Sequence, residues 1–233
     1  KLGVMKRLMI VGLACGLLSN GESLTIRLYN LANAPAKTID RASVVAAQVL
    51  AQAGVAAIWE EGSPDSLEGR LTDMTPGGSL AAAGRREYLV VSIVNAPSAD
   101  VYPGTLGYAV PFAREGAQAT VFYDRLERLY FGSTVIPDLG SLLGAAIAHE
   151  IGHVMLGTNE HSARGIMKAR WGTPEFQLLA CKRLHFAPEN ASALRANVAA
   201  RFVTPGLATW LAACPTSVCR TAGPAARQIL DQA

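Results

Sequence analysis

Two histidines separated by three residues form the most informative pattern in this sequence. His149 and His153 stand four positions apart, and on a helix this spacing places both imidazoles on one face, where they can bind one metal ion. Glu150 lies beside the pair, where it can accept a proton from metal-activated water. The pattern therefore predicts a metal-dependent hydrolytic site with Glu150 as its general base.

A catalytic zinc site needs a third protein ligand, because zinc takes three ligands from the protein and keeps a fourth position for water. Three of the chain's 4 histidines lie within residues 149–161, and we favour His161 as the third ligand. Gly157 can adopt the left-handed conformation that ends a helix, and the chain can then turn back toward the metal. Glu160 remains an alternative because a carboxylate also binds zinc, and a more distant residue is a third option.

This segment resembles the active-site region of the metzincin clan of zinc endopeptidases. The resemblance rests on the histidine pair with its glutamate, a following glycine, a third histidine, and Met167 soon afterwards. It implies a Zn²⁺-dependent peptidase that acts on a peptide or protein, with Met167 in a tight turn beneath the metal. Gly157 and His161 lie one and two residues later than the clan's spacing, which would place Asn159, a poor zinc ligand, at the third position.

The resemblance also bears on the residues that follow Met167. Lys168, Arg170 and Trp171 stand where the clan lines its specificity pocket, although an aromatic residue at such a junction also serves packing. Two other functions stay open. One is a thermolysin-like peptidase with a carboxylate as third ligand, and the other is a non-catalytic, exported zinc-binding protein of the cell envelope.

Hydrophobic periodicity predicts the elements that position these residues. Predicted strands cover residues 24–29, 55–59, 88–94, 106–112 and 119–123, and predicted helices cover 38–53, 138–156, 175–184, 190–202 and 225–230. Strand 88–94 is apolar on both faces and should be central, whereas 106–112 and 119–123 look like an antiparallel or edge pair. The edge of a sheet can hold an extended peptide, so 119–123 is either that edge or an internal strand.

The first predicted helix joins two strands that a right-handed crossover would make parallel, with Thr38 or Asp40 as its N-cap. Asp138 or Ser141 should cap the helix that carries the histidine pair. We therefore predict an α+β fold: a mixed twisted sheet with a crossover helix and an active-site helix, followed by a mainly helical C-terminal part.

Length and composition favour a single domain over residues 22–233. Within it, residues 22–157 should form the sheet and active-site helix, and residues 158–233 the methionine turn and a helical C-terminal subdomain. The formal charge of +3 includes no basic run, so nothing predicts a nucleic-acid partner.

The N-terminal 21 residues are typical of an export signal. Lys6 and Arg7 precede an apolar run, residues 8–18, which is too short to span a bilayer. We therefore expect a secreted, periplasmic or envelope protein without a membrane span. A lipid anchor at Cys15 is an alternative, but residues 12–14 fit a lipoprotein cleavage site poorly.

Export would permit disulfides among the cysteines that follow the signal. Cys214 and Cys219 flank a short loop and are the favoured pair, while Cys181 would remain as a thiol buried on a helix. The alternative is that all three are reduced and act as small hydrophobic residues.

Overall fold

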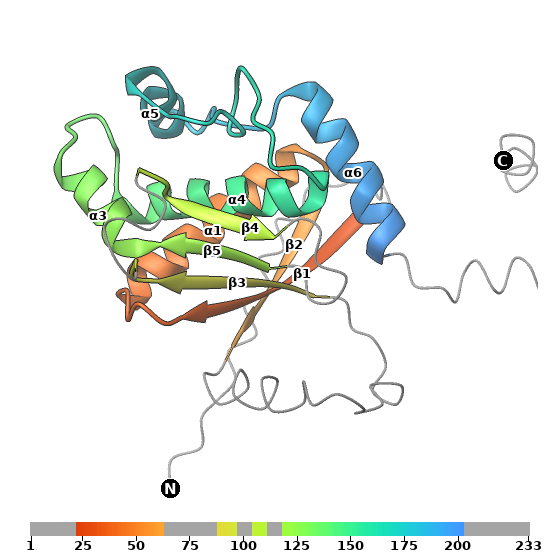
Figure 1. Ribbon diagram of the computed structural model, residues 1–233, viewed down its shortest axis with the longest axis horizontal. Coiled ribbons are helices and arrows are strands. Elements are labelled where there is room, and N and C mark those ends of the chain that lie inside the picture. The colour runs from red at the N-terminus through yellow and green to blue at the C-terminus, as the bar shows by residue number, and fades with distance from the viewer. Residues whose placement is uncertain (1–21, 63–87, 97–103, 111–117, 203–233) are drawn as a thin grey trace, which may run out of the picture. The chain divides into compact units, whose positions relative to one another are not determined.

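The computed structural model describes residues 22–62, 88–96, 104–110 and 118–202 (Figure 1). The expected export signal with Cys15, the Cys214–Cys219 bridge and the final helix at 225–230 lie outside these residues. The strands are β1 (Glu22–Asn30), β2 (Val55–Glu61), β3 (Leu89–Val94), β4 (Gly107–Val110) and β5 (Gln118–Phe122). The helices are α1 (Ala36–Gln52), α3 (Tyr123–Phe131), α4 (Leu139–Leu156), α5 (Thr173–Ala180) and α6 (Pro188–Phe202).

The five strands form one mixed sheet in the order β2-β1-β3-β5-β4. All neighbouring strands are parallel except β4 and β5, which pair antiparallel. The structure thereby confirms the α+β class, the parallel β1-α1-β2 unit and the central position of β3. It also decides the role of β5, which lies between β3 and β4, so the edge strand on this side of the sheet is β4.

Helices α1 and α4 pack against each other and against the sheet (Figure 1). Two glycines of α4 allow the close approach. A Cβ on Gly144 would lie 2.5 Å from the carbonyl oxygen of Ala42 in α1, and one on Gly140 would lie 2.7 Å from Arg41. Any side chain larger than hydrogen at these positions would push the two helices apart.

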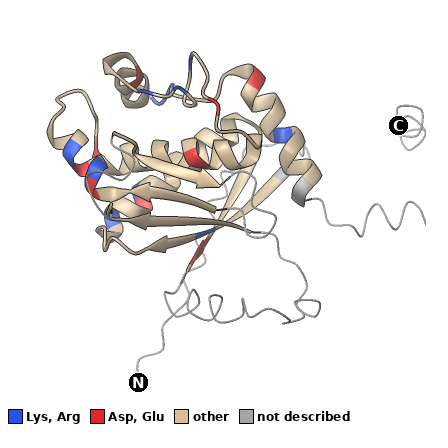
Figure 2. Ribbon diagram, viewed as in Figure 1, with Lys and Arg blue, Asp and Glu red and all other residues tan. Residues whose placement is uncertain are grey.

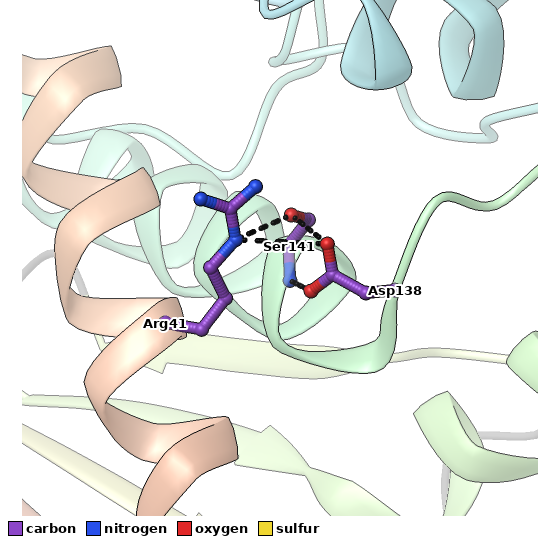
Figure 3. A network of polar contacts seen from close by, with 3 residues as sticks. All are labelled: Arg41, Asp138 and Ser141. Carbon is purple, nitrogen blue, oxygen red and sulfur yellow. Dashed lines mark hydrogen bonds and ion pairs between the residues drawn. The ribbon is translucent and has the colours of Figure 1, made fainter.

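A polar network joins the start of α4 to α1 (Figure 3). Asp138 is the N-cap of α4, as predicted, and its carboxylate accepts a hydrogen bond from the backbone N–H of Ser141 at 2.6 Å. The Ser141 hydroxyl donates to the same carboxylate, and Arg41 Nε of α1 donates to the Ser141 oxygen at 3.1 Å. This network satisfies donors at the helix start and holds α4 in register with α1.

The predicted cap of α1 is wrong. The helix begins after Pro35, which has no capping side chain, so neither Thr38 nor Asp40 serves as N-cap. The proline ring presets a φ of −56°, and its carbonyl accepts the N–H of Thr38 at 2.8 Å. Asn30 closes the preceding turn through its side-chain amide, whose N–H donates to the Ala34 carbonyl and whose oxygen accepts the Ala34 N–H.

Helix α3 was not predicted from the sequence. It follows β5 without an intervening turn, and its N-cap is Phe122, which makes no side-chain capping bond. Without a start signal, Tyr123 looks like the last residue of a strand. The helix buries Tyr123 and Leu126 and leaves Phe131 exposed at its end.

Two corrections concern the C-terminal helices. Helix α5 ends at Ala180, earlier than predicted, and Lys182 follows it with a left-handed φ of 56°. Cys181 is exposed at the end of α5, so the expectation that its thiol is buried on a helix is wrong. Helix α6 begins two residues earlier than predicted, at Pro188.

Helix α4 is long and apolar enough to cross a membrane by length and composition, but 89% of it is buried inside the protein. It is thus the core helix of the described part of the chain. Helix α6 braces its C-terminal end, where Asn197 donates to the carbonyl of Met155 at 2.8 Å.

Replacing Gly144 with alanine should lower the free energy of unfolding by about 1–3 kcal/mol, because the methyl group has no room against α1. Chemical denaturation of the metal-free protein measures this change. Gly132→Ala is the control, since a methyl group there meets only carbonyl oxygens of its own helix at 3.2 Å and beyond. Equal stability of Gly144→Ala and wild type would contradict the close packing of α1 on α4.

Candidate metal centre

His149 and His153 lie one turn apart on α4, and both side chains are buried. Each ring is held through its Nδ1 atom by a backbone carbonyl. His149 Nδ1 donates to the carbonyl oxygen of Ile166 at 2.7 Å, and His153 Nδ1 donates to that of Thr158 at 2.9 Å. A carbonyl oxygen can only accept, so the proton of each neutral ring resides on Nδ1.

This tautomer makes Nε2 of each ring a hydrogen-bond acceptor. The two Nε2 atoms face each other at 3.0 Å, where two lone pairs cannot bond to each other. A cation between them would satisfy both. The separation is close to the roughly 3.3 Å expected for two nitrogens about 2.05 Å from one tetrahedral zinc ion.

Burial also prepares these rings to bind a metal. Desolvation lowers the pKa of His149 to about 4, and it lowers the pKa of His153 as well. The hydrogen bonds to the carbonyls oppose this effect but do not overcome it. Both imidazoles therefore remain neutral near pH 7, which is the state that coordinates metals.

His161 joins the pair from the coil that follows α4. Gly157 ends the helix in the left-handed conformation, with φ of 66°, as the sequence predicts. The ring of His161 then lies 4.8 Å from that of His153 and 5.4 Å from that of His149, between centroids. Ligand atoms of the three histidines lie within 4.8 Å of one another, so the group could hold a metal ion.

The longer spacing before His161 is taken up by a turn at Thr158. Its hydroxyl accepts the backbone N–H of Glu160 at 3.0 Å, while its carbonyl is the partner of His153. Glu160 and Asn159 are both exposed. Among the described residues, Glu160 is not part of the metal-binding group, so the geometry favours His161 as the third ligand.

Glu150 lies on α4 next to His149, with only 6% of its surface exposed. Burial raises the pKa of its carboxyl group to about 8. The side chain packs against β4 at Gly107, where a Cβ would lie 2.8 Å from Glu150 Oε1 and 2.5 Å from the backbone oxygen of Thr120. Gly107 thus makes room for the carboxyl group between helix and strand.

Met167 is buried in a tight turn, as expected, with the N–H of Lys168 bonded to the carbonyl of Gly165 at 3.2 Å. Its sulfur lies against Gly152, the residue before His153, so closely that a Cβ on Gly152 would collide with it. Met167 therefore packs against the turn of α4 that carries the histidines. The position of Met167 beneath a bound metal remains a prediction.

Trp171 shares a hydrogen-bond acceptor with His149. Its indole Nε1 donates to the carbonyl oxygen of Ile166 at 3.1 Å, the same oxygen that holds the His149 ring. The indole stands edge-on to that ring, with 5.7 Å between centroids. Trp171 thereby fixes the carbonyl that orients a candidate metal ligand.

The three histidines and Glu150 line a cleft of about 570 Å³. One wall comes from β4 and the coil before it, including Tyr108, and another from the segment 168–171. The predicted pocket residues Lys168, Arg170 and Trp171 all line the same cleft. This volume is within the usual range for a small-molecule or peptide side-chain site.

Sequence reasoning missed the parts of the site that belong to the backbone. The carbonyls of Thr158 and Ile166 orient two histidines, but a backbone carbonyl has no signature in the sequence. Gly107 did have a signal, because a glycine inside a predicted strand often marks close approach of another group.

The sequence matches no protein-family model, and no curated protein matches it. Among solved structures, the fold is similar to an archaemetzincin from Methanopyrus kandleri, with 19% identity, a TM-score of 0.43, and coverage of 78% of this chain and 99% of that one. An archaemetzincin from Archaeoglobus fulgidus shows 18% identity and a TM-score of 0.39 over 73% of this chain and 99% of its own.

Metalloproteinase-II from Bacteroides fragilis shows 12% identity and a TM-score of 0.45. The match covers 76% of this chain and 53% of the Bacteroides chain, so this protein spans about half the length of that one.

Trp171→Phe should weaken zinc binding by about tenfold, because the change removes the N–H that fixes the Ile166 carbonyl while it keeps an aromatic ring. Competition with a chromogenic chelator measures the affinity. Trp59→Phe is a matched control, since Trp59 does not line the cleft and its buried Nε1 has no hydrogen-bond partner among the described residues. If both variants bind zinc as wild type does, Trp171 has no role in orienting His149.

Proposed function

We propose that this protein is a zinc-dependent peptidase that hydrolyses peptide bonds, with the character of a metzincin endopeptidase. The observation that carries the proposal is the convergence of three imidazoles beside a buried carboxyl group, all of them in one cleft. Metal ligands alone would fit a structural site, but a structural zinc site usually has four protein ligands. The described residues offer three, which leaves room for water and substrate.

The proposed zinc ligands are His149, His153 and His161. Their chemistry suits zinc, which favours neutral imidazole nitrogen, and the first two are already in the required tautomer. When bound, zinc would supply a Lewis acid that activates water and polarises the carbonyl group of the scissile bond. Three neutral ligands leave the positive charge of the ion undiminished.

Glu150 is the proposed general base. It accepts a proton from the attacking water and passes it to the leaving amine. Burial raises the pKa of this carboxyl, and a cation held by the histidines would favour the ionised form that can accept a proton. Gly107 holds open the space that the carboxyl group occupies.

The edge strand β4 is the proposed support for the substrate backbone. Within the described part of the chain it pairs only with β5, so its other edge has no strand partner. Gly107 and Tyr108 of this strand line the cleft that contains the histidines. An extended peptide can add to such an edge through backbone hydrogen bonds, which would place its carbonyl groups near the site.

We also propose that the protein is exported, and this part of the proposal rests on residues 1–21 alone. N-terminal sequencing of the protein recovered from a secreting host would test it. A mature chain that begins near residue 22 is the expected result, and retention of residues 1–21 on exported protein would contradict cleavage of the signal.

Glu150→Gln should retain zinc and lose peptidase activity by about 10²- to 10⁴-fold, because glutamine keeps the shape of the side chain but cannot accept the proton. Zinc content is measured by elemental analysis, and cleavage by quenched fluorescent peptides and casein. Removal of zinc by a chelator should abolish the cleavage, and added zinc should restore it.

Unchanged cleavage by Glu150→Gln would overturn the assigned mechanism. Zinc binding by the wild type without cleavage of any peptide would instead favour the non-catalytic, zinc-binding alternative.

His161→Ala should weaken zinc binding more than about 100-fold, beyond the usual effect of changes outside the ligand set. Glu160→Ala is the matched control, because Glu160 precedes His161 in the sequence, is exposed, and lies outside the histidine group. Both are measured by the chelator competition used for Trp171. The opposite order of affinities would identify Glu160 as the third ligand, as in a thermolysin-like peptidase.

A further inference from the structure

The cleft is lined by more basic than acidic side chains, and the two basic residues differ in whether they form an ion pair. Two cationic residues, Lys168 and Arg170, line it, whereas Glu150 is its one acidic lining residue among those the structure describes. Glu150 is assigned to proton transfer in the proposed reaction. Of the two cations, the one without an ionic partner is the one that can attract an acidic group of a substrate.

Lys168 is already neutralised by a neighbour. Its Nζ forms an ion pair with Glu175 Oε1 at 2.7 Å, and the other carboxylate oxygen accepts the backbone N–H of Gly172 at 2.8 Å. Glu175 is 8% exposed, so this pair is shielded from solvent on the carboxylate side. Lys168 thus serves to fix the coil against α5 more than to bind a ligand.

Arg170 is different because it has no ion pair or hydrogen bond to another described residue. Its side chain is exposed and lines the cleft. Arg164, on the same coil, forms an ion pair with Glu189 at 3.3 Å. Figure 2 shows the Lys and Arg positions on the coil that leads to α5.

The backbone on both sides of Arg170 is anchored. Lys168 is tied to Glu175, and Trp171 is tied through its indole N–H to the carbonyl of Ile166. The indole also stands against the ring of His149. The segment that carries Arg170 therefore has a fixed position beside the metal centre, which lowers the entropy cost of binding a ligand there.

We propose that Arg170 recognises a carboxylate of the substrate close to the scissile bond. This inference rests on the proposed peptidase function and names its substrate class: peptides with an acidic group beside the cleaved bond. The planar guanidinium offers paired N–H donors that match the two oxygens of a carboxylate, and no residue in the described part of the chain competes for them.

The carboxylate can come from two sources. An aspartate or glutamate side chain near the cleaved bond would make the protein an endopeptidase with acidic specificity. A free C-terminus would make it a carboxypeptidase. Both present the same group to Arg170, so substrates have to separate them.

The experiment uses the full chain loaded with zinc and a set of quenched peptides in which glutamate or glutamine is placed at each position around the scissile bond. Each peptide is made with a free and with an amidated C-terminus. The wild type should cleave the best glutamate peptide about fivefold faster in kcat/KM than its glutamine partner, whatever its C-terminus. Arg170→Ala should remove this ratio, and Arg170→Glu should invert it, so that the glutamine peptide is cleaved faster.

Arg164→Ala is the matched control, because it removes the same charge from the same coil at a residue that does not line the cleft. It should keep the wild-type ratio. A preference for the free over the amidated C-terminus that is lost in Arg170→Ala would support the terminal carboxylate as source. Equal rates for glutamate and glutamine peptides together with equal rates for free and amidated peptides, or equal loss of preference in Arg164→Ala, would overturn the role of Arg170.

Binding is measured separately in zinc-loaded Glu150→Gln, which should hold peptides without cleaving them. Fluorescence anisotropy should show about fivefold tighter binding of the glutamate peptide, and the added Arg170→Ala change should abolish that difference. Equal binding of glutamate and glutamine peptides, together with equal binding of free and amidated peptides, overturns the inference about Arg170. Failure of the proposed function is distinct, because it would show as absence of cleavage by the zinc-loaded wild type on every peptide.

Discussion

Two backbone carbonyls impose the constraint on which the candidate site depends. By accepting the Nδ1 protons of His149 and His153, the carbonyls of Ile166 and Thr158 turn the opposite nitrogens into acceptors that face each other at 3.0 Å. Two acceptors that face each other with no donor between them are unfavourable, because their lone pairs repel each other. A cation relieves this cost. The same bonds tie α4 to the coil that follows it, so metal binding and the local fold are coupled.

Several glycines allow backbone and side chains to approach α4 from three directions. Gly144 admits α1, Gly152 admits Met167, and Gly107 on β4 admits the carboxyl group of Glu150. Because α4 is buried on nearly all sides, its surface has to be complementary to each neighbour. The rigid packing of this helix keeps the histidines and the glutamate in place, while the exposed His161 approaches from a coil. The side chains on α4 are thus held most firmly in position, whereas the position of His161 depends on the geometry of the turn before it.

Charge in the cleft is divided between fixed and available groups. Glu175 neutralises Lys168 and anchors the coil, whereas Arg170 on the same coil has no such partner among the described residues. Trp171, the next residue, contributes both to the histidine pair and to the cleft. Its indole N–H donates to the carbonyl that orients His149, and its side chain forms part of the cleft wall. The proposed contact of Arg170 with substrate and the contact of Trp171 that orients His149 therefore involve adjacent residues of one short segment.

The sequence alone determined the features that depend on local spacing. The separation of His149 and His153 predicts the shared helix face, Gly157 predicts the left-handed helix end, and apolar runs predict the strands and the central position of β3. The sequence left the third ligand open between His161 and Glu160, placed 119–123 either at an edge or inside the sheet, and gave no sign of α3. In the tertiary structure, the turn at Thr158 brings His161 rather than Glu160 to the histidine pair, and strand order places β5 inside the sheet. The carbonyl of Ile166, 17 residues along the chain, fixes the tautomer of His149. The strand order and this last contact join residues distant in sequence, and no local pattern of residue types encodes them.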